Sequence, residues 1–145
     1  MSLMDNEILT ARQRLLDCGY TCVLLQNGEE YCSRERGVKP LLSLLDKGRS
    51  FCGAVAADKT VGAGAAHLYV LLGVRAVWAR VISAAALDIL ERNGIAAAYD
   101  ERVEYIVNRK GDGMCPIEAA VLGAKDSNEA YGLIIGTLES LQGGN

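Results

Sequence analysis

The stretch of residues 51–73 constrains the fold of this chain more than any other segment. An apolar run over 51–57 is followed by the charged pair Asp58-Lys59 and then by a glycine-spaced segment with helical periodicity. This order predicts a buried strand over 51–57, a tight turn at Asp58-Lys59 and a helix over 61–72. The apolar run does not alternate with polar residues, which is typical of a strand buried on both faces of a parallel sheet.

The rest of the chain is predicted to alternate helices with strands. Asn27-Gly28 separates two strand-like runs, and both residues tolerate the positive φ angles of a two-residue hairpin turn. The expected strands cover residues 20–26, 29–32, 51–57, 75–82 and 95–99, and the expected helices cover residues 5–18, 38–45, 61–72, 84–92, 116–122 and 127–141; residues 103–107 fit a short strand or a helical turn. The repeated strand–helix order after residue 51 implies right-handed crossovers, so the predicted class is α/β with a mostly parallel sheet.

Length and composition exclude several classes of protein. The 145 residues predict a single domain over 1–145, with residues 1–4 and 142–145 frayed or left over from expression. The net charge of -3 and the pI near 5.2 argue against a nucleic acid polymer as a partner. No apolar run reaches the ~18–20 residues that span a bilayer and no signal peptide is recognisable, so no membrane partner is expected. Five cysteines without metal-site spacing indicate reduced thiols and a cytoplasmic location.

A set of short phrases spread over most of the chain carries a resemblance to a known family. The phrases are Ser33-Arg34, residues 37–40, residues 53–59 with Val61-Gly62, Ile82-Ser83, Gly94-Ile95, Tyr99-Asp100, Asn108-Arg109 and residues 115–118. Together they resemble the domain-of-unknown-function family DUF1893, and the order of elements resembles the cytidine-deaminase-like fold. The resemblance implies a three-layer α/β/α domain with a mixed five-stranded sheet, an N-terminal hairpin and C-terminal helices. It implies no established activity.

The resemblance also indicates where a zinc ion would bind. Working deaminases place a His or Cys with a Glu at the start of the second helix, and a Pro-Cys-x-x-Cys motif at the start of the third. The corresponding residues of this chain, 37–40 (Gly-Val-Lys-Pro) and 58–62 (Asp-Lys-Thr-Val-Gly), contain neither His nor Cys. We therefore expect no metal site, no cofactor and no zinc-dependent deamination.

Asp58, Lys59 and Gly62 form the first candidate binding site. Ligands of parallel α/β sheets bind beyond the carboxyl ends of the strands, where a helix N-terminus offers unpaired N–H groups to an anion. Gly62 and Gly64 would let a phosphate approach the backbone, and Lys59 adds a positive charge. The alternative is structural, because Asp58 and Thr60 can cap the helix while the glycines permit close helix packing.

A second group of candidates precedes the second predicted helix. If the second and third helices begin side by side, as the resemblance implies, Ser33, Arg34, Arg36 and Lys39 lie at the same rim as Lys59. A lysine at the position of a metal ligand favours an anion over a cation as the guest. The alternative is a solvated charged loop, which is the usual environment of such a run.

Cys115 is the candidate catalytic residue. It precedes Pro116 at a predicted helix N-cap, where the helix dipole favours the thiolate form of a cysteine. Glu118 stands where a capping-box acid would, and its charge would oppose a thiolate. A structural cap with an unreactive sulfur is therefore the alternative interpretation of Cys115.

These observations favour a small-molecule binding protein. It would bind a small anionic ligand, nucleotide-like or a phosphorylated metabolite, on a deaminase-like scaffold without zinc. The alternative is a metal-free enzyme of group transfer or hydrolysis that uses Cys115 as its nucleophile. A structural or regulatory subunit is a third reading, and a homo-oligomer is compatible with each. Three polar residues, Asp100, Asn108 and Arg109, can line the edge of the pocket or only form turns.

Overall fold

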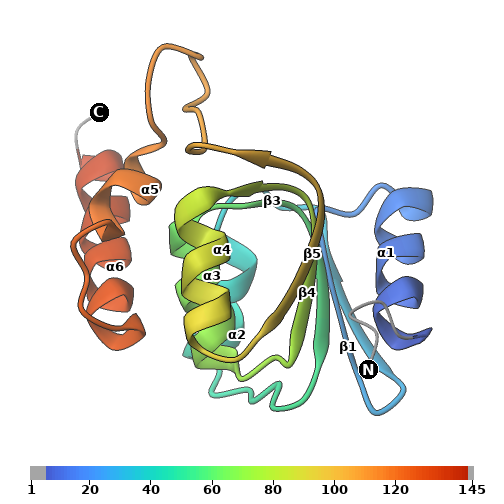
Figure 1. Ribbon diagram of the computed structural model, residues 1–145. Helices are drawn as coiled ribbons and strands as arrows, with labels where there is room; N and C mark the ends of the chain where they lie inside the picture. Colours follow the sequence, from blue (N-terminus) through green and yellow to red (C-terminus); the bar gives the residue numbers. More distant parts are fainter. Residues whose placement is uncertain (1–5, 144–145) are drawn as a thin grey trace.

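The computed structural model describes residues 6–143, and they form one mixed five-stranded sheet with helices on both faces (Figure 1). The strands lie in the order β2 (Glu29–Ser33), β1 (Cys22–Gln26), β3 (Val55–Val61), β4 (Ala76–Ser83) and β5 (Ala96–Val103). The first two strands form an antiparallel hairpin, and β1 is also antiparallel to β3. The last three strands are parallel to one another. The predicted class, α/β with an N-terminal hairpin, is confirmed.

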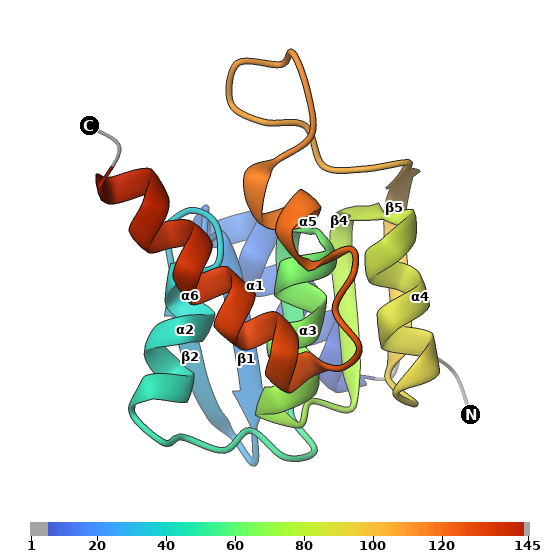
Figure 2. The ribbon, with the colours of Figure 1, turned by 90° about the vertical axis from the view of Figure 1, so that its left-hand side faces the viewer.

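Helices cover the two faces of the sheet unequally. One face packs against α1 (Asn6–Cys18) alone, and the other packs against α2 (Lys39–Asp46), α3 (Ala63–Leu72) and α4 (Ala84–Arg92). The short α5 (Pro116–Val121) and the long α6 (Ser127–Gly143) then pack against the outer side of α3 (Figures 1 and 2). The predicted α/β/α layers are therefore present, and the C-terminal helices add a partial outer layer.

The outer layer explains why α3 is so apolar. Eight of its ten residues are buried, because the sheet covers one side of the helix and α6 covers the other. The sequence AGAAHLYVLL supplies small residues where neighbouring helices approach closely. Gly64 lies against Ile117 of α5 and Ile134 of α6, where any side chain would meet theirs. His67 is buried in this layer and shares a 2.9 Å hydrogen bond with the Ser127 hydroxyl, as expected of a satisfied structural histidine.

The predicted hairpin turn is confirmed. Asn27 and Gly28 both have positive φ, 49° and 83°, as a two-residue turn requires. The strands that it joins are shifted from their predicted bounds by two residues or fewer. Ser83 caps α4, since its hydroxyl accepts a hydrogen bond from the Ala86 N–H at 3.2 Å.

The central strand lies four residues later than predicted. Residues 51–54 form a turn, in which Gly53 has a φ of 80° that an extended strand cannot contain. The strand β3 begins at Val55 and continues through Asp58 and Lys59, which were predicted to form a turn. Asp58 pairs with Cys22 of β1 on one side and with Ala79 of β4 on the other. The prediction was wrong because the polar residues Asp58 and Lys59 were taken as the end of the strand, although the backbone of β3 continues to pair with its neighbours there.

Smaller differences occur at the other ends. The strand β5 runs to Val103, four residues beyond its predicted end, and α6 runs to Gly143, two beyond its predicted end. The helix α6 thus includes Gln142 and Gly143, which were predicted to lie beyond the last helix. The predictions for residues 1–4 and 144–145 lie outside the described residues.

Within residues 6–143, no helix is both long and apolar enough to cross a bilayer.

Candidate functional site

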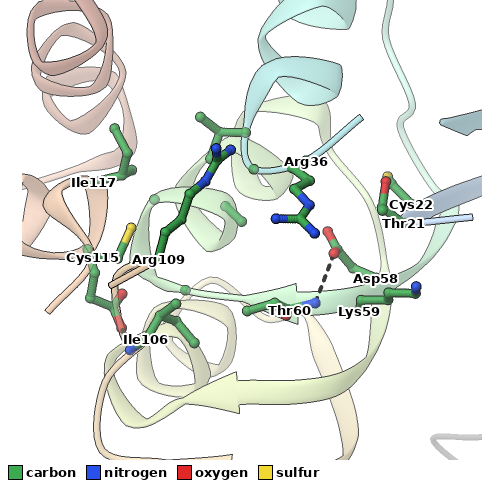
Figure 3. A pocket seen from close by; sticks show the side chains of 16 residues that line it. Thr21, Cys22, Arg36, Asp58, Lys59, Thr60, Ile106, Arg109, Cys115 and Ile117 are labelled. Atoms are coloured by element: carbon green, nitrogen blue, oxygen red, sulfur yellow. Dashed lines mark hydrogen bonds between the residues drawn. The ribbon is translucent and has the colours of Figure 1, made fainter. Parts of the chain in front are cut away.

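A pocket of about 420 Å³ opens at the end of β3, where α2 and α3 begin (Figure 3). Five separate segments build it: the start of β1, the loop before α2, the end of β3 with the start of α3, the loop after β5, and the beginning of α5. The lining residues are Thr21, Cys22, Arg36, Gly37, Val38, Asp58, Lys59, Thr60, Gly62, Gly64, Ala65, Ile106, Arg109, Cys115, Ile117 and Glu118. Parallel α/β sheets bind ligands beyond the carboxyl ends of their strands, and this pocket lies at such an end.

The last residues of β3 reach the pocket because β1 begins opposite Asp58. Cys22 is the first residue of β1 and pairs with Asp58, so the side of β3 beyond this point has no ladder neighbour. The Lys59 N–H still donates to the Thr21 carbonyl at 3.1 Å, which fixes the backbone here. Asp58, Lys59 and Gly62 of the predicted site all line the pocket, whereas the Lys59 ammonium extends away from Arg36 and Arg109 (Figure 3).

Asp58 is the most perturbed acid at the site. The Tyr69 hydroxyl donates to Asp58 Oδ2 at 2.6 Å, and the Thr60 N–H donates to Asp58 Oδ1 at 3.1 Å. Burial raises the pKa of Asp58 to about 7, and the hydrogen bonds from Tyr69 and Thr60 oppose this shift without cancelling it. The carboxyl therefore changes charge close to neutral pH. The predicted capping role of Asp58 is wrong, because the first residue of α3 bonds to Glu118 instead.

Behind Asp58 lies a buried hydrogen-bonded chain. Cys22 Sγ is 3.3 Å from the Tyr69 hydroxyl oxygen. Because the single hydroxyl hydrogen of Tyr69 is given to Asp58, the Cys22 thiol is the donor in this contact. Burial raises the pKa of both Tyr69 and Cys22, so both groups stay neutral while Asp58 titrates. These hydrogen bonds from Cys22 of β1 to Tyr69 of α3 and on to Asp58 hold the Asp58 carboxyl in place.

The loop before α2 brings Arg36, and not Arg34, to the pocket. The Thr21 hydroxyl shares its one hydrogen between the carbonyl oxygens of Glu35, at 2.6 Å, and Ser33, at 3.0 Å, which anchors the loop to the sheet. Arg34 points back toward α1, where its guanidinium donates to the Cys18 carbonyl and lies 4.4 Å from the centre of the Tyr20 ring.

Ser33 and Lys39 do not line the pocket either. The Ser33 hydroxyl accepts the Glu35 N–H at 3.0 Å within the loop. Lys39 is exposed at the first residue of α2, although the preceding Gly37 and Val38 line the pocket. The two helix starts therefore meet at one pocket as expected, but Arg36 supplies the charge that was expected from Arg34 and Lys39.

Glu118 joins the loop after β5 to the central helix. Its carboxylate, 2% exposed, accepts the N–H of Ala63 at the start of α3 and the N–H of Ile106 in the loop. Glu118 is therefore not the capping-box acid of α5. The loop beyond Ile106 closes on itself through the Asn108 N–H, which donates to the Gly113 carbonyl at 2.8 Å, and it carries Arg109 into the pocket wall.

Two backbone donors remain at the start of α3. Glu118 takes the Ala63 N–H, whereas the N–H groups of Gly64 and Ala65 have no hydrogen-bond acceptor within residues 6–143. Both residues line the pocket. Unpaired N–H groups of a first helical turn are donors for an anion. The close contact of Gly64 with Ile117 also confirms the packing role considered for the glycines.

Cys115 lies in the pocket wall at the N-cap of α5, as predicted. Its thiol makes no capping hydrogen bond. Cys22 also lines the pocket, although no role was predicted for it, and its sulfur contacts the Tyr69 hydroxyl. The other three cysteines lie outside the pocket lining, and all five are free thiols.

Among residues 6–143, no three His, Cys, Asp or Glu side chains gather closely enough to hold a metal ion. The positively charged residues of the pocket are Arg36, Lys59 and Arg109, and the acidic ones are Asp58 and Glu118. Positive side chains outnumber acidic ones, three to two. The pocket therefore suits an anion better than a cation.

Comparison with known proteins identifies the family. The family model described as Domain of unknown function (DUF1893) matches residues 10–137. The chain belongs to this family. A solved structure of a DUF1893 family protein from Thermotoga maritima is 25% identical, with a TM-score of 0.82 over 94% of this chain and 92% of that one. The predicted family is thus confirmed, and with it a fold shared along almost the whole chain.

Two deaminases are also among the solved structures that match. A dCMP deaminase from the cyanophage S-TIM5, in apo form, is 14% identical with a TM-score of 0.47, over 69% of this chain and 100% of that one. A diaminohydroxyphosphoribosylaminopyrimidine deaminase/5-amino-6-(5-phosphoribosylamino)uracil reductase from Thermotoga maritima is 12% identical with a TM-score of 0.44, over 81% of this chain and 41% of that one. No curated protein matches this chain.

Proposed function

We propose that this protein binds a small anionic ligand, a nucleotide-like compound or another phosphorylated metabolite, in the pocket between β3, α2 and α3. The observation that carries the proposal is the convergence of Arg109 with the unpaired N–H groups of Gly64 and Ala65 on one cavity. These groups come from the loop after β5 and from the central helix, which the chain brings together only in the folded state.

The size of the pocket supports this proposal. Small-molecule sites usually enclose about 300–1,000 Å³, and this cavity of about 420 Å³ lies in that range. Its wall also contains apolar side chains, among them Ile106 and Ile117, which can contact the uncharged part of a ligand. An anion with a small organic body fits such a lining better than a free inorganic ion does.

Charge favours an anion near Arg109 over one near Lys59. The Arg109 side chain begins beside Cys115 and its guanidinium lies between Ile117 and Arg36 in Figure 3, whereas the Lys59 ammonium extends away from both arginines. A guanidinium can donate two parallel hydrogen bonds to a phosphate. Among the first N–H groups of α3, Glu118 accepts that of Ala63, so the anion would take the next two amides of the helix. Arg109 is therefore the side chain on which affinity should depend most.

Thermal unfolding with ribose 5-phosphate as the probe tests the proposal. At a concentration of ~100 times its dissociation constant, a ligand stabilises the folded state by about 2.7 kcal/mol, roughly 5–10 °C in Tm for a domain of this size. Arg109→Gln should remove most of the shift. Lys110→Gln is the matched control, because Lys110 is an exposed neighbour in the same loop that does not line the pocket.

The outcomes separate clearly. A shift that Arg109→Gln removes and Lys110→Gln preserves supports the anion site. A shift that both variants preserve places the anion elsewhere. The absence of any shift with ribose 5-phosphate, inorganic phosphate and nucleoside monophosphates contradicts the proposal.

A second candidate function rests on Cys115, whose thiol lines the pocket without a capping hydrogen bond. In this alternative, Cys115 is the nucleophile of a metal-free group transfer or hydrolysis. The test is alkylation by iodoacetamide near pH 7, followed site by site with mass spectrometry. Fast labelling of Cys115 that ribose 5-phosphate slows would support the enzyme. Equal labelling rates at Cys115 and the exposed Cys52 would contradict it.

We also propose a cytoplasmic location for this activity. The support is chemical: phosphorylated metabolites are ligands of that compartment, and none of the five cysteines forms a disulfide.

A further inference from the structure

The anion site leaves one end of the pocket without a role. Asp58 and Arg36 lie at that end, on β3 and on the loop before α2 respectively. The Arg36 guanidinium points toward the Asp58 carboxyl (Figure 3), yet the ion pairs found among residues 6–143 do not include this pair. A donor and an acceptor that face each other across a cavity without bonding are both open to a third group.

Asp58 has acceptor capacity left for such a group. Each of its oxygens accepts one hydrogen bond, from the Thr60 N–H and from the Tyr69 hydroxyl. A carboxylate oxygen has two lone-pair sites, so each can accept one hydrogen bond more. Tyr69 and Cys22 are both buried, and Cys22 is bonded to Tyr69 behind the carboxyl, so neither side chain can move to the free lone pairs of Asp58. Asp58 is thus an oriented acceptor on the pocket wall.

Arg36 provides the complementary donor. Its loop is anchored by the Thr21 hydroxyl, with a 2.6 Å hydrogen bond to the carbonyl of the preceding Glu35. A guanidinium has only N–H donors and a carboxylate has only acceptors. The group that satisfies both at once has a carbonyl oxygen beside an N–H, as in an amide, a urea or a pyrimidine ring.

We propose that Asp58 and Arg36 bind a planar amide-type edge, an N–H beside a carbonyl, of the same ligand whose anionic group binds at Arg109. This inference rests on the proposed function and names the chemical class of ligand: a phosphorylated compound with a pyrimidine-like or ureido head. Asp58 accepts the N–H, and Arg36 donates to the carbonyl. Asp58 is then a specificity-determining residue, because it distinguishes a head group with an N–H from one without.

The pH dependence of this recognition follows from the surroundings of Asp58. The groups that face it are Tyr69 from α3, Cys22 from β1 and Arg36 from the loop, with Lys59 next to it in the strand. Burial raises the pKa of Tyr69 and of Cys22, so both stay neutral near neutral pH while Asp58 changes charge. Its pKa of about 7 means that the carboxylate becomes the main form above that pH. An N–H donor binds the carboxylate form best. The preference for a ligand with an N–H over one without it should therefore increase from pH 6 to pH 8.

The experiment compares three probes by isothermal titration calorimetry. Uridine 5′-monophosphate has an N–H between two carbonyls, N3-methyluridine 5′-monophosphate has the carbonyls without the N–H, and ribose 5-phosphate has the anion alone. At pH 8 we expect uridine 5′-monophosphate to bind about tenfold or more tightly than its methylated form, as one charge-assisted hydrogen bond implies. The ratio should decrease toward pH 6. Asp58→Asn should remove the pH dependence and most of the ratio, and Arg36→Gln should weaken both nucleotides.

The outcomes separate this inference from the proposed function. If ribose 5-phosphate binds but the two nucleotides bind equally at pH 8, the amide-edge inference is wrong and the anion site remains. If the preference for uridine 5′-monophosphate persists unchanged in Asp58→Asn, methylation acts by bulk and the inference is again wrong. If none of the three probes binds, the proposed function fails and the inference fails with it.

Discussion

Asp58 shows how burial can change the chemistry of a single residue. An aspartate at the surface is ionised at neutral pH, but burial in the pocket wall raises the pKa of this one to about 7, against the hydrogen bond from Tyr69. Between pH 4 and pH 7 the folded protein therefore keeps a proton that the unfolded chain has released. Stability from this group is lost as the pH rises through that window.

The first prediction follows from that proton. In the wild type, the Asp58 contribution to the free energy of unfolding should fall by a few kcal/mol between pH 4 and pH 7, then stay level, because each unit of pKa shift corresponds to about 1.4 kcal/mol. Asp58→Asn should lack this fall. Urea denaturation at each pH measures it. Asp46→Asn, at an exposed site on α2, should behave like the wild type, and an equally steep fall in Asp58→Asn would refute the assignment.

Lys59 gives a second residue-scale prediction. Its ammonium extends outward, so it contributes charge to the pocket without contacting an anion near Arg109 (Figure 3). We expect Lys59→Gln to weaken ribose 5-phosphate binding by less than tenfold, since exposed charges contribute modestly. Lys39→Gln, the exposed lysine of the neighbouring helix, should have no effect. A larger loss for Lys59→Gln than for Arg109→Gln would show that the anion lies at the rim.

At the scale of elements, the start of α3 is where the site and the core meet. Gly64 lets Ile117 approach the helix, and Glu118 one residue later binds the helix N-terminus and the loop after β5. The same contacts that fix α5 against α3 also hold the wall that carries Arg109. Packing and ligand binding therefore depend on one junction.

The junction predicts an effect of Gly64→Ala. A methyl group there meets the branched Ile117 side chain, which cannot move aside as a flexible chain end would. We expect a loss of about 1–3 kcal/mol, the usual result of overpacking. Gly136→Ala on α6 is the control, since nothing lies within 4 Å of the added carbon. It should be neutral or add up to about 1 kcal/mol, because alanine favours helix. Equal effects of the two substitutions would disprove the close contact.

Glu118→Gln tests the other half of the junction. The amide keeps one acceptor oxygen, so it cannot hold both the Ala63 and the Ile106 N–H groups. We expect faster hydrogen exchange at one or both of these amides and a loss of about 1–3 kcal/mol. The exposed Glu139→Gln should change neither quantity. Unchanged exchange at both amides in Glu118→Gln would contradict the junction.

Elements could be predicted from local patterns, while their exact ends could not. The turn residues Asn27 and Gly28 act through their own backbone, and Ser83 acts through a hydroxyl that bonds three residues ahead, so these features depend only on local sequence. The start of β3 depended on Gly53 having a positive φ, and its end depended on pairing with β1 and β4. Pairing is a long-range property, and polar residues that pair resemble a turn when only their order is known.

At the scale of the whole molecule, the pocket is a product of topology. Arg36 and Arg109 are far apart in the chain and meet because the loop before α2 and the loop after β5 lie at the same end of the sheet (Figure 3). The sequence suggested both residues, Arg36 beside Arg34 and Arg109 among the tail residues, but could not tell which arginine faces the cavity. That choice depends on the Thr21 and Glu118 anchors, which join segments distant in sequence.

The position of a bound anion tests the central claim most directly. A crystal structure with ribose 5-phosphate should place the phosphate within hydrogen-bond distance of the Gly64 and Ala65 N–H groups and of the Arg109 guanidinium. A phosphate bound at another surface, with this pocket occupied only by water, would contradict the account.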